Sequence, residues 1–351
     1  MSGIALQHAS SISSRPTRLG FLGVGWIGRN RMEAMLATGH CEAVVIAEPS
    51  TDMMTAAAKV APSARFVGTL DELLTEDLDG VVIATPSAQH AEQSIRALHA
   101  GRAVFCQKPL GRNTVEVKAV LAAAKAANKL LGVDLSYRHT EGMRRIKQLL
   151  KAGDLGNVMA IDLTFHNAYG PDKPWFYDRL QSGGGCVIDL GVHLIDLALW
   201  AMDFPKIIAV SSHLMEQGKR VSQDRDHVED YAVATLKLAS GTIVRLACSW
   251  RLNAGCDCVI DASFYGTGGG AALRNIDGSF YNFVAHRFKG TTHEQLAQPP
   301  DDWGGRAAIA WAQQLKKSSE FDPAAEGLVA VSQAIDLIYQ SGSMTGEPTG
   351  Q

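Results

Sequence analysis

The chain has 351 residues, 46% of them hydrophobic and 20% charged, with a formal net charge of -3. This apolar content excludes a disordered chain, and the small negative charge argues against binding to nucleic acid or to an anionic membrane. Because single hydrophobic cores usually stop growing at about 250–300 residues, we expect two domains.

The six cysteines are scattered through the chain and show no small-domain disulfide framework. Cys256 and Cys258 have no second pair at zinc-site spacing, so we expect no metal site, and a reducing cytoplasm fits this pattern best. Residues 1–17 are rich in serine and lack the apolar stretch of a signal peptide, which predicts a disordered or extended segment. No apolar run approaches the roughly 20 residues that cross a bilayer, so no membrane partner is expected.

Short apolar segments alternate with helix-like segments up to about residue 135. Strands are predicted at 19–22, 43–47, 81–84, 103–106 and 131–133, and helices at 27–37, 91–100 and 114–127. Alternation of this kind is typical of a parallel sheet with helices on both faces. Residues 18–135 are therefore predicted to form a Rossmann domain that binds NAD(P).

After residue 135 the predicted strands become longer and look antiparallel. They lie at 158–165, 207–214, 231–238, 242–250 and 259–265. Ser240-Gly241 joins two of them over a distance suited to a hairpin turn. Residues 136–351 are predicted to form an α+β domain for substrate binding and oligomerisation, with a large, open, mostly antiparallel sheet and a C-terminal helix at about 324–339.

A glycine-rich motif lies between the first strand and the first helix. Gly23, Gly25 and Gly28 form G-x-G-x-x-G, and Trp26 and Ile27 stand between the last two glycines. In this motif the first glycine makes the turn, the second lets the backbone approach a pyrophosphate, and the third allows close packing of helix and strand.

Glu48 ends the second predicted strand about 20 residues beyond the motif, where this fold places the carboxylate that binds the ribose hydroxyls. That carboxylate favours NAD and would repel the 2′-phosphate of NADP, which is the alternative cofactor. The alternative is a glycine-rich turn that binds no nucleotide, with Glu48 as a solvated strand end.

Four segments resemble a known family. They are GVGWIG at 23–28, ATPSAQH at 84–90, CQKPLGRN at 106–113 and SGGGCVIDLGVHLIDLALW at 182–200. Together with most of the chain from about residue 18, they resemble the Gfo/Idh/MocA oxidoreductases, named after glucose-fructose oxidoreductase, inositol dehydrogenase and rhizopine catabolism. Family members usually carry Glu-Lys-Pro where this chain has Gln107-Lys108-Pro109, so a carboxylate is missing before the lysine.

The resemblance implies that Lys108 lies near the nicotinamide and that Asp189 and His193 flank the substrate. Oxidation of a secondary alcohol needs a base, and a histidine titrates near neutral pH. The ammonium of Lys108 would stabilise a developing alkoxide, and Asp189, one helical turn before His193, would orient the imidazole. The alternatives are a helix cap at Asp189 and a core histidine at position 193, and Asp196 is either structural or supports the site.

The segment after the predicted strand 81–84 is where the family packs the nicotinamide and its ribose. The candidate cofactor contacts there and before the lysine are Thr85, Pro86, Ser87, His90 and Gln107. The alternative is an ordinary turn in which Ser87 caps the next helix. Pro109 is a candidate for a cis peptide bond that holds Lys108 in place.

Polar and aromatic residues gather in segments 165–178 and 249–253 and resemble the walls of a sugar pocket. The candidate substrate contacts are Tyr137, Arg138, His166, Asn167, Trp175 and Trp250. Packing at a domain interface is the alternative for each of them. Arg138 would also suit a substrate carboxylate, because its planar donors match one.

The predicted function is hydride transfer between NAD(P) and a secondary alcohol or ketone of a sugar, cyclitol, polyol or sugar acid. Reduction of a keto-sugar is the reverse direction of the same chemistry. Other classes are an NAD-dependent glycosidase that oxidises its sugar transiently and a nonenzymatic sensor that binds a nucleotide. The open second sheet predicts a homo-oligomer, either a dimer or a tetramer.

Overall fold

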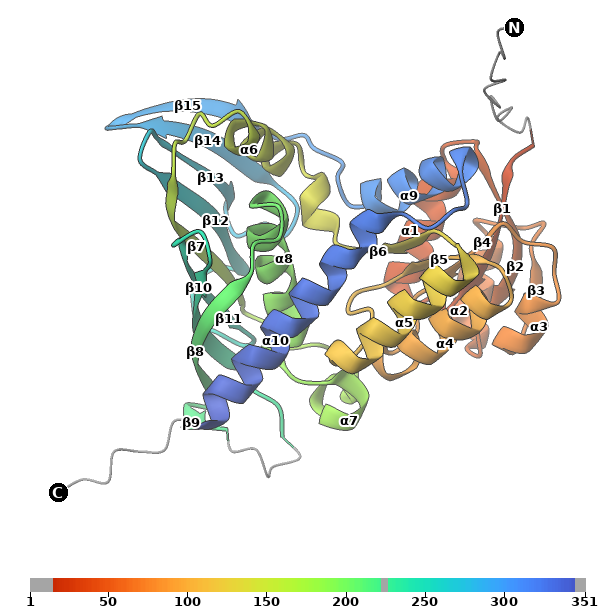
Figure 1. Ribbon diagram of the computed structural model, residues 1–351. Coiled ribbons are helices and arrows are strands. Elements are labelled where there is room, and N and C mark those ends of the chain that lie inside the picture. The colour runs from red at the N-terminus through yellow and green to blue at the C-terminus, as the bar shows by residue number, and fades with distance from the viewer. Residues whose placement is uncertain (1–14, 222–226, 345–351) are drawn as a thin grey trace, which may run out of the picture.

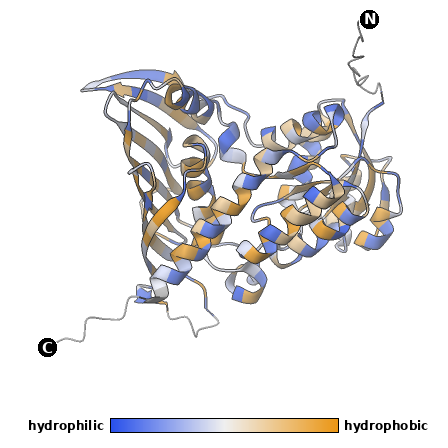
Figure 2. Cartoon of the chain, in the orientation of Figure 1, coloured by the Kyte–Doolittle hydropathy of each residue, from blue (hydrophilic) through white to orange (hydrophobic). Residues whose placement is uncertain are grey.

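The computed structural model describes residues 15–221 and 227–344, and the predicted segment 1–17 therefore lies mostly outside the described part. The chain builds two sheets that lie next to each other, joined by long helices (Figure 1). Apolar residues are concentrated in the strands of both sheets (Figure 2). Burial of these side chains supplies the main stabilisation of each half.

The first sheet is parallel and has the order β3-β2-β1-β4-β5-β6. Its strands are β1 (Thr17–Leu22), β2 (Cys41–Ala47), β3 (Arg65–Val67), β4 (Gly80–Ile83), β5 (Ala103–Cys106) and β6 (Leu131–Val133). The strand order reverses between β1 and β4, and in such sheets ligands bind in the crevice at the carboxyl ends of these two strands. This is the predicted Rossmann fold, with the addition of the three-residue strand β3.

Helices cover both faces of this sheet, as the alternating pattern predicts. They are α1 (Trp26–Leu36), α2 (Thr51–Ala58), α3 (Leu70–Leu74), α4 (Ser87–His99) and α5 (Thr114–Ala127). A helix from the far end of the chain, α9 (Arg306–Lys317), also packs here. Its Trp311 ring centroid lies 5.6 Å from that of Phe105 on β5.

The second sheet has nine strands in the order β15-β14-β13-β12-β7-β11-β10-β8-β9. They are β7 (Val158–Asn167), β8 (Ile207–Glu216), β9 (Lys219–Arg220), β10 (Tyr231–Leu238), β11 (Ile243–Ser249), β12 (Cys258–Gly266), β13 (Gly270–Asn275), β14 (Phe283–Lys289) and β15 (Thr292–Ala297). The predicted hairpin at Ser240-Gly241 joins β10 to β11, and Gly241 has a φ of 90°.

Not every neighbouring pair in this sheet is antiparallel, because β7 and β11 run parallel. The reason is the helical crossover between β7 and β8, after which β8 runs parallel to β7. From β8 the chain reaches β11 through two antiparallel pairings, so β11 also keeps that direction.

Helices α6, α8 and α10 and the turn η3 cover one face of the second sheet. The helical segments of this half are the 3-10 turn η1 (Ser136–His139), α6 (Glu141–Lys151), the 3-10 turn η2 (Pro174–Tyr177), α7 (Arg179–Ser182), the π-helical turn η3 (Val187–Gly191), α8 (Val192–Ala201), the 3-10 turn η4 (Pro323–Glu326) and α10 (Gly327–Met344). The predicted C-terminal helix at about 324–339 corresponds to η4 and α10. Figure 1 shows the opposite face of the sheet without a helix.

Helix α10 runs diagonally across the molecule and links the two halves (Figure 1). Asp336 accepts a hydrogen bond of 3.0 Å from the backbone N–H of Thr114 on α5. The Ser212 hydroxyl on β8 donates a 2.5 Å hydrogen bond to the carbonyl of Ile338. One helix therefore fixes the position of the second sheet relative to the first.

One stretch, 179–201, is long and apolar enough to cross a membrane, which the sequence-based expectation had missed. Its apolar window is 83% buried inside the protein, because α8 packs in the core of the second half.

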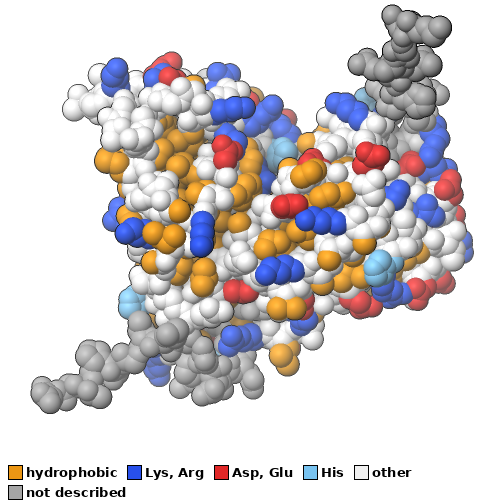
Figure 3. All heavy atoms as spheres, in the orientation of Figure 1, with side chains coloured by type: hydrophobic (Ala, Val, Ile, Leu, Met, Phe, Trp, Pro, Cys, Tyr) orange, Lys and Arg blue, Asp and Glu red, His pale blue; other side chains and the backbone are white. Residues whose placement is uncertain are grey.

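On the face shown in Figure 3, positive and negative side chains are interspersed and form no field of one sign.

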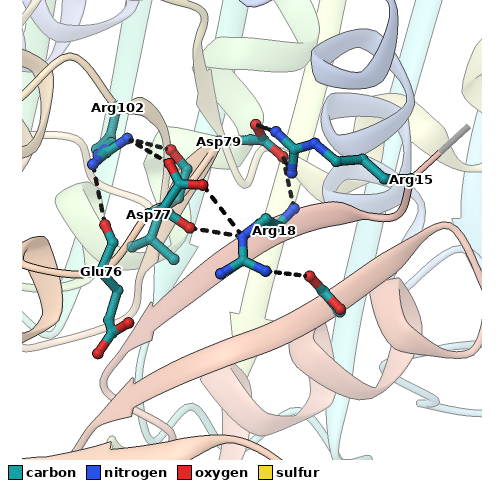
Figure 4. Close-up of polar contacts among 8 residues, drawn as sticks. Arg15, Arg18, Glu76, Asp77, Asp79 and Arg102 are labelled. Atoms are coloured by element: carbon teal, nitrogen blue, oxygen red, sulfur yellow. Dashed lines mark hydrogen bonds and ion pairs between the residues drawn. The ribbon is translucent and has the colours of Figure 1, made fainter. Parts of the chain in front are cut away.

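A polar cluster ties the start of β1 to the start of β4 (Figure 4). Arg15 donates to both oxygens of Asp79 at 2.7 and 3.0 Å, and the backbone N–H of Arg18 donates to the same carboxylate at 2.8 Å. Arg102 donates to the carbonyl of Glu76 at 3.0 Å. The cluster occupies the amino edge of the sheet, which leaves the carboxyl edge for the candidate site.

Candidate active site

A cavity of about 1850 Å³ lies between the two halves at the carboxyl edge of the first sheet. The glycine-rich turn, the end of β2 and the loops after β4 and β5 line one side of it. Residues of η1, η2, η3 and α8 line the other side. The volume exceeds the roughly 300–1,000 Å³ of common ligand pockets, so it is large enough for a dinucleotide together with a second molecule.

The three glycines of the turn have the properties expected of a dinucleotide motif. Gly23 has a φ of 82°, and a Cβ there would lie 2.8 Å from the carbonyl oxygen of Ala84. A Cβ on Gly28 would overlap the carbonyl of Gly23, so this glycine permits close packing and does not line the cavity. A Cβ on Gly25 would meet no atom within 4 Å, which leaves open space against the turn.

Helix α1 begins directly after Gly25 and presents its N-terminus to the cavity. No side chain of the described chain caps it, and its first turn carries no acidic residue. The exposed N–H groups and the positive end of the helix dipole suit a pyrophosphate. Trp26 and Ile27 of this first turn also line the cavity. These features fit a dinucleotide at the turn.

Glu48 at the end of β2 lines the cavity, but it is only 8% exposed and is not a solvated strand end. Its carboxylate accepts hydrogen bonds from the backbone N–H groups of Val24 at 2.9 Å and Ser50 at 3.0 Å. Glu48 therefore holds the glycine turn against β2. A carboxylate has about four acceptor positions, so two remain for ribose hydroxyls.

His90 ties together two loops of the cavity. Its ring nitrogens lie 2.6 Å from the carbonyl oxygen of Pro109 and 2.7 Å from that of Thr85. Burial lowers the pKa of His90 below the ordinary histidine value. Both nitrogens are thus occupied by backbone atoms, and His90 supports the loop formed with Pro86 and Ser87, which also line the cavity. The Lys108–Pro109 peptide bond is cis, as predicted.

Lys108 and Asp189 form an ion pair inside the cavity. The Lys108 ammonium donates to Oδ1 of Asp189 at 2.6 Å and to the Asp189 carbonyl at 2.7 Å. The indole N–H of Trp250 donates to Oδ2 of Asp189 at 3.0 Å. Trp250 does not line the cavity and is 3% exposed. Trp250 therefore orients Asp189 from the side away from the cavity. The prediction that Trp250 contacts the substrate differs from this position.

His193 lines the same cavity, with the ring of Tyr137 at a centroid distance of 4.9 Å. Its Nδ1 is buried and has no hydrogen-bond partner among residues 15–221 and 227–344. Burial and the nearby charges of Lys108 and Arg31 hold the pKa of His193 well below the ordinary value. The imidazole is therefore neutral near pH 7 and can accept a proton.

The predicted contact between Asp189 and His193 is absent from the hydrogen bonds of the described chain. Both oxygens of Asp189 are directed to Lys108 and Trp250. The reason is local, because Asp189 lies in the π-helical turn η3, which widens the backbone just before α8 begins. Such turns are frequent at functional sites. Asp189 thus positions the lysine and leaves the histidine unpaired.

Glu229 and Tyr339 explain two of the glycines before this turn, Gly184 and Gly185. The Glu229 carboxylate accepts from the backbone N–H of Gly185 at 3.1 Å and of Val187 at 2.9 Å, and it accepts from the Tyr339 hydroxyl at 2.9 Å. A Cβ on Gly184 would overlap Tyr339, and one on Gly185 would overlap the backbone of Glu229. The glycines let this anchor reach the segment that carries Asp189 and His193.

Three predicted substrate contacts lie elsewhere. Arg138 forms a two-pronged ion pair with buried Asp196, so it is committed to the core and gives Asp196 a structural role. His166 points to the far side of β7, where its Nδ1 lies 2.8 Å from the Ser249 hydroxyl. Asn167 accepts from the backbone N–H of Tyr169 at 2.8 Å. None of the three lines the cavity, whereas Tyr137 and Trp175 do.

Several lining residues were missed because no motif marks them: Arg31 lies on α1, Phe176 lies in η2, and the others lie in loops. These are Arg31, Asp134, Phe176, Phe280, Tyr281, Asp301, Asp302 and Trp303. Asp134 had a usable signal, since it directly follows β6 at the carboxyl edge of the sheet. In the part of the chain that the structure describes, no group of three or more His, Cys, Asp or Glu side chains could hold a metal ion.

Comparison with known proteins agrees with this geometry. A family model described as an NAD-binding Rossmann fold of the oxidoreductase family matches residues 17–135, and a GFO/IDH/MocA C-terminal domain model matches residues 143–272. The chain is 29% identical to the 1,5-anhydro-D-fructose reductase of Ensifer adhaerens over 233 residues, which are 65% of this chain and 68% of that protein. It is 25% identical to the D-glucoside 3-dehydrogenase of Escherichia coli strain K12 over 276 residues, 75% of this chain and 79% of that protein.

Among solved structures, levoglucosan dehydrogenase in complex with NADH and levoglucosan has the same fold. The TM-score is 0.80 at 21% identity, covering 94% of this chain and 98% of that chain. The fold and the matching models define an NAD-binding oxidoreductase with a Rossmann domain. More specifically, the chain belongs to the Gfo/Idh/MocA oxidoreductase family.

Proposed function

We propose that this protein transfers a hydride between NAD(P) and a secondary alcohol or ketone of a neutral sugar, cyclitol or polyol. One observation carries the proposal: His193, whose buried Nδ1 has no hydrogen-bond partner in the described chain, and the ion-paired Lys108 line the same cavity as the glycine turn. The sugar-modifying relatives agree with this substrate class.

In the oxidation direction His193 accepts the proton of the substrate hydroxyl, because its lowered pKa keeps the imidazole neutral. The Lys108 ammonium donates a hydrogen bond to the same oxygen and stabilises its developing negative charge. The Asp189 carboxylate keeps Lys108 directed into the cavity. Bound NAD supplies the hydride acceptor. In the reverse direction His193 returns the proton to the carbonyl oxygen.

The charges around the cavity favour a neutral substrate over a sugar acid. Every Lys or Arg that lines it has a carboxylate partner: Arg31 with Asp134, Arg96 with Asp71, Lys108 with Asp189 and Lys173 with Asp172. Arg138, the predicted ligand for a substrate carboxylate, is paired with Asp196 outside the cavity. A substrate carboxylate would have to displace one of these partners.

Aromatic residues supply apolar surface for a sugar ring. Trp175 and Phe176 stack at a centroid distance of 3.8 Å, and both line the cavity together with Trp303. Aromatic faces cover the C–H faces of sugars, and nearby polar groups bind the hydroxyls.

Turnover of a defined substrate panel tests the proposal. The purified protein is incubated with NAD and, separately, NADP, and with D-glucose, methyl glucoside, myo-inositol and D-gluconate, and absorbance is followed at 340 nm. Reduction of cofactor by a neutral member and a much lower kcat/KM for gluconate are expected. Preference for gluconate would overturn the neutral substrate, and release of free glucose from methyl glucoside without net cofactor reduction would indicate a glycosidase.

We also propose a homo-oligomer formed through the uncovered face of the second sheet. That face carries two ion pairs between neighbouring strands, Arg245 with Asp162 and Arg274 with Asp261. Light scattering after gel filtration tests the homo-oligomer: a charge-reversed Arg245→Glu variant should shift to a smaller species, while a monomeric wild-type protein would contradict it.

A cytoplasmic location is proposed because all six cysteines are free.

A further inference from the structure

A chain of hydrogen bonds connects the nucleotide-binding helix to the catalytic lysine. Arg31 on α1 donates from Nε to Oδ2 of Asp134 at 2.6 Å, and Asp134 is 1% exposed. The side-chain amide of Gln107 donates to the same oxygen at 2.8 Å. The side-chain oxygen Oε1 of Gln107 accepts a hydrogen bond from the backbone N–H of Lys108 at 3.0 Å.

The second oxygen of Asp134 is also occupied. It accepts a hydrogen bond from the Ser136 hydroxyl, which itself accepts one of 3.1 Å from Nη2 of Arg31. Asp134 is thus a buried carboxylate with three donors around it. A buried carboxylate persists only with such partners, because they replace the hydration that the charge loses on burial.

The amide at position 107 is required by this arrangement. A glutamate there, the residue expected from the family motif, would bring a carboxylate oxygen to the place of the Gln107 nitrogen, 2.8 Å from Asp134. It would have no hydrogen to donate when ionised, and the two negative charges would repel each other. Gln107 can both donate to Asp134 and accept from Lys108.

We propose that Asp134 carries the carboxylate that the family motif places before the lysine, and that Arg31, Asp134 and Gln107 act as positioning residues for Lys108. This inference rests on the proposed function, in which Lys108 stabilises the substrate oxygen. In this chain the carboxylate beside the lysine motif stands directly after β6, and it is paired with one guanidinium, that of Arg31.

The location of the cluster gives it two effects. Gln107 holds the backbone of Lys108 at its N–H, while Asp189 holds the ammonium at the other end of the same residue. Asp134 also balances the charge of Arg31, which lies close enough to His193 to lower its pKa. The cluster therefore sets both the position of the lysine and the charge near the histidine.

A charge-exchange cycle tests this assignment. Gln107→Glu and Asp134→Asn are made singly and together, and kcat, KM and the melting temperature are measured for the full-length protein with NAD and the best neutral sugar. Each single variant should lose about tenfold or more in kcat, with a smaller change in KM. The double variant restores one carboxylate and one amide, and it should recover most of the lost kcat and melting temperature.

Two exposed sites supply matched controls, Gln313→Glu on α9 and Asp277→Asn before β14. Both should leave kcat unchanged. Additive losses in the double variant, or a Gln107→Glu variant with wild-type kcat, would overturn the proposal.

A readout without substrate separates this proposal from the proposed function. Labelling of Lys108 by trinitrobenzenesulfonate in the presence of NADH, followed by mass spectrometry, reports how well the amine is held. The single variants should label faster and the double variant at nearly the wild-type rate. If the four proteins show this labelling pattern while the wild type turns over no sugar, the proposed function is wrong and the positioning role holds. Equal labelling in all four proteins would remove the positioning role.

Discussion

The ammonium of Lys108 contacts both the carboxylate and the backbone carbonyl of Asp189, at 2.6 and 2.7 Å. A single residue of the second half thus holds the lysine that we propose to be catalytic, in the first half. Since Asp189 lies in the π-helical turn that precedes α8, the position of that turn decides where the lysine points. The site is complete only when the two halves are packed together.

Removal of the indole donor behind Asp189 should impair catalysis without touching the cavity wall. In Trp250→Phe the aromatic packing stays while the 3.0 Å hydrogen bond to Oδ2 is lost. We expect kcat to fall about tenfold, since hydrogen bonds to charged groups contribute roughly 1.5–3 kcal/mol. NADH binding, measured by fluorescence titration, should stay within about twofold of wild type; an unchanged kcat would show that Asp189 needs no such support.

The pH profile should show a base with an unusually low pKa. Burial, Lys108 and Arg31 lower the pKa of His193, and the active form is the neutral one. The rate of oxidation should therefore be flat on the acid side of neutrality and fall only at pH values below the ordinary histidine range. In His193→Asn this acid limb should disappear together with most of the activity, whereas His213→Asn, exposed on β8, should keep both.

If the limb persists in His193→Asn, another group is the base. The measurement is kcat/KM against pH at constant ionic strength.

Glu48 should affect both cofactor choice and the turn it holds. In Glu48→Ala the backbone N–H groups of Val24 and Ser50 lose their acceptor, and the repulsion of a 2′-phosphate is removed. We expect weaker NAD binding, a smaller loss for NADP, and a loss of about 1–3 kcal/mol in the free energy of unfolding. Calorimetric titration with both cofactors checks this, with Glu42→Ala at the opposite edge of the sheet as control. An unchanged ratio of the two affinities would contradict the role in cofactor choice.

Gly25 and Gly28 should respond differently to alanine. Gly25→Ala adds a methyl group to open space, so the melting temperature should stay near the wild-type value while NADH binding weakens at least about tenfold. Gly28→Ala drives a methyl group into the carbonyl of Gly23 and should lower the melting temperature as well. Wild-type NADH affinity in Gly25→Ala would show that no pyrophosphate approaches the turn at this point.

Much of the fold was predictable because its signals are local. The strand, the glycines, the helix and Glu48 follow one another within about 30 residues, and the motifs around Lys108 and His193 carry their own context. The alternation Ile161, Leu163, Phe165 toward the core even indicates that His166 faces away, although its polarity suggested a pocket.

The parts of the fold and of the site that could not be predicted depend on contacts between segments that are distant in the sequence. The parallel pairing of β7 and β11 and the return of α9 to the first sheet leave no local pattern in the sequence. The commitment of Arg138 to Asp196 joins residues 58 positions apart. Similarly, Asp134 and Arg31 are 103 positions apart, so only the folded chain shows that Gln107 has a carboxylate beside it.

Cofactor reduction at 340 nm by the wild-type protein and by Lys108→Ala, with NAD and a neutral sugar, tests the central claim most directly. The wild type should reduce NAD in proportion to sugar oxidised. Lys108→Ala should lose at least about a hundredfold in kcat while it binds NADH nearly as well, and the exposed Lys118→Ala should match the wild type. Full activity in Lys108→Ala, or sugar turnover with no net change in NAD, would contradict the account.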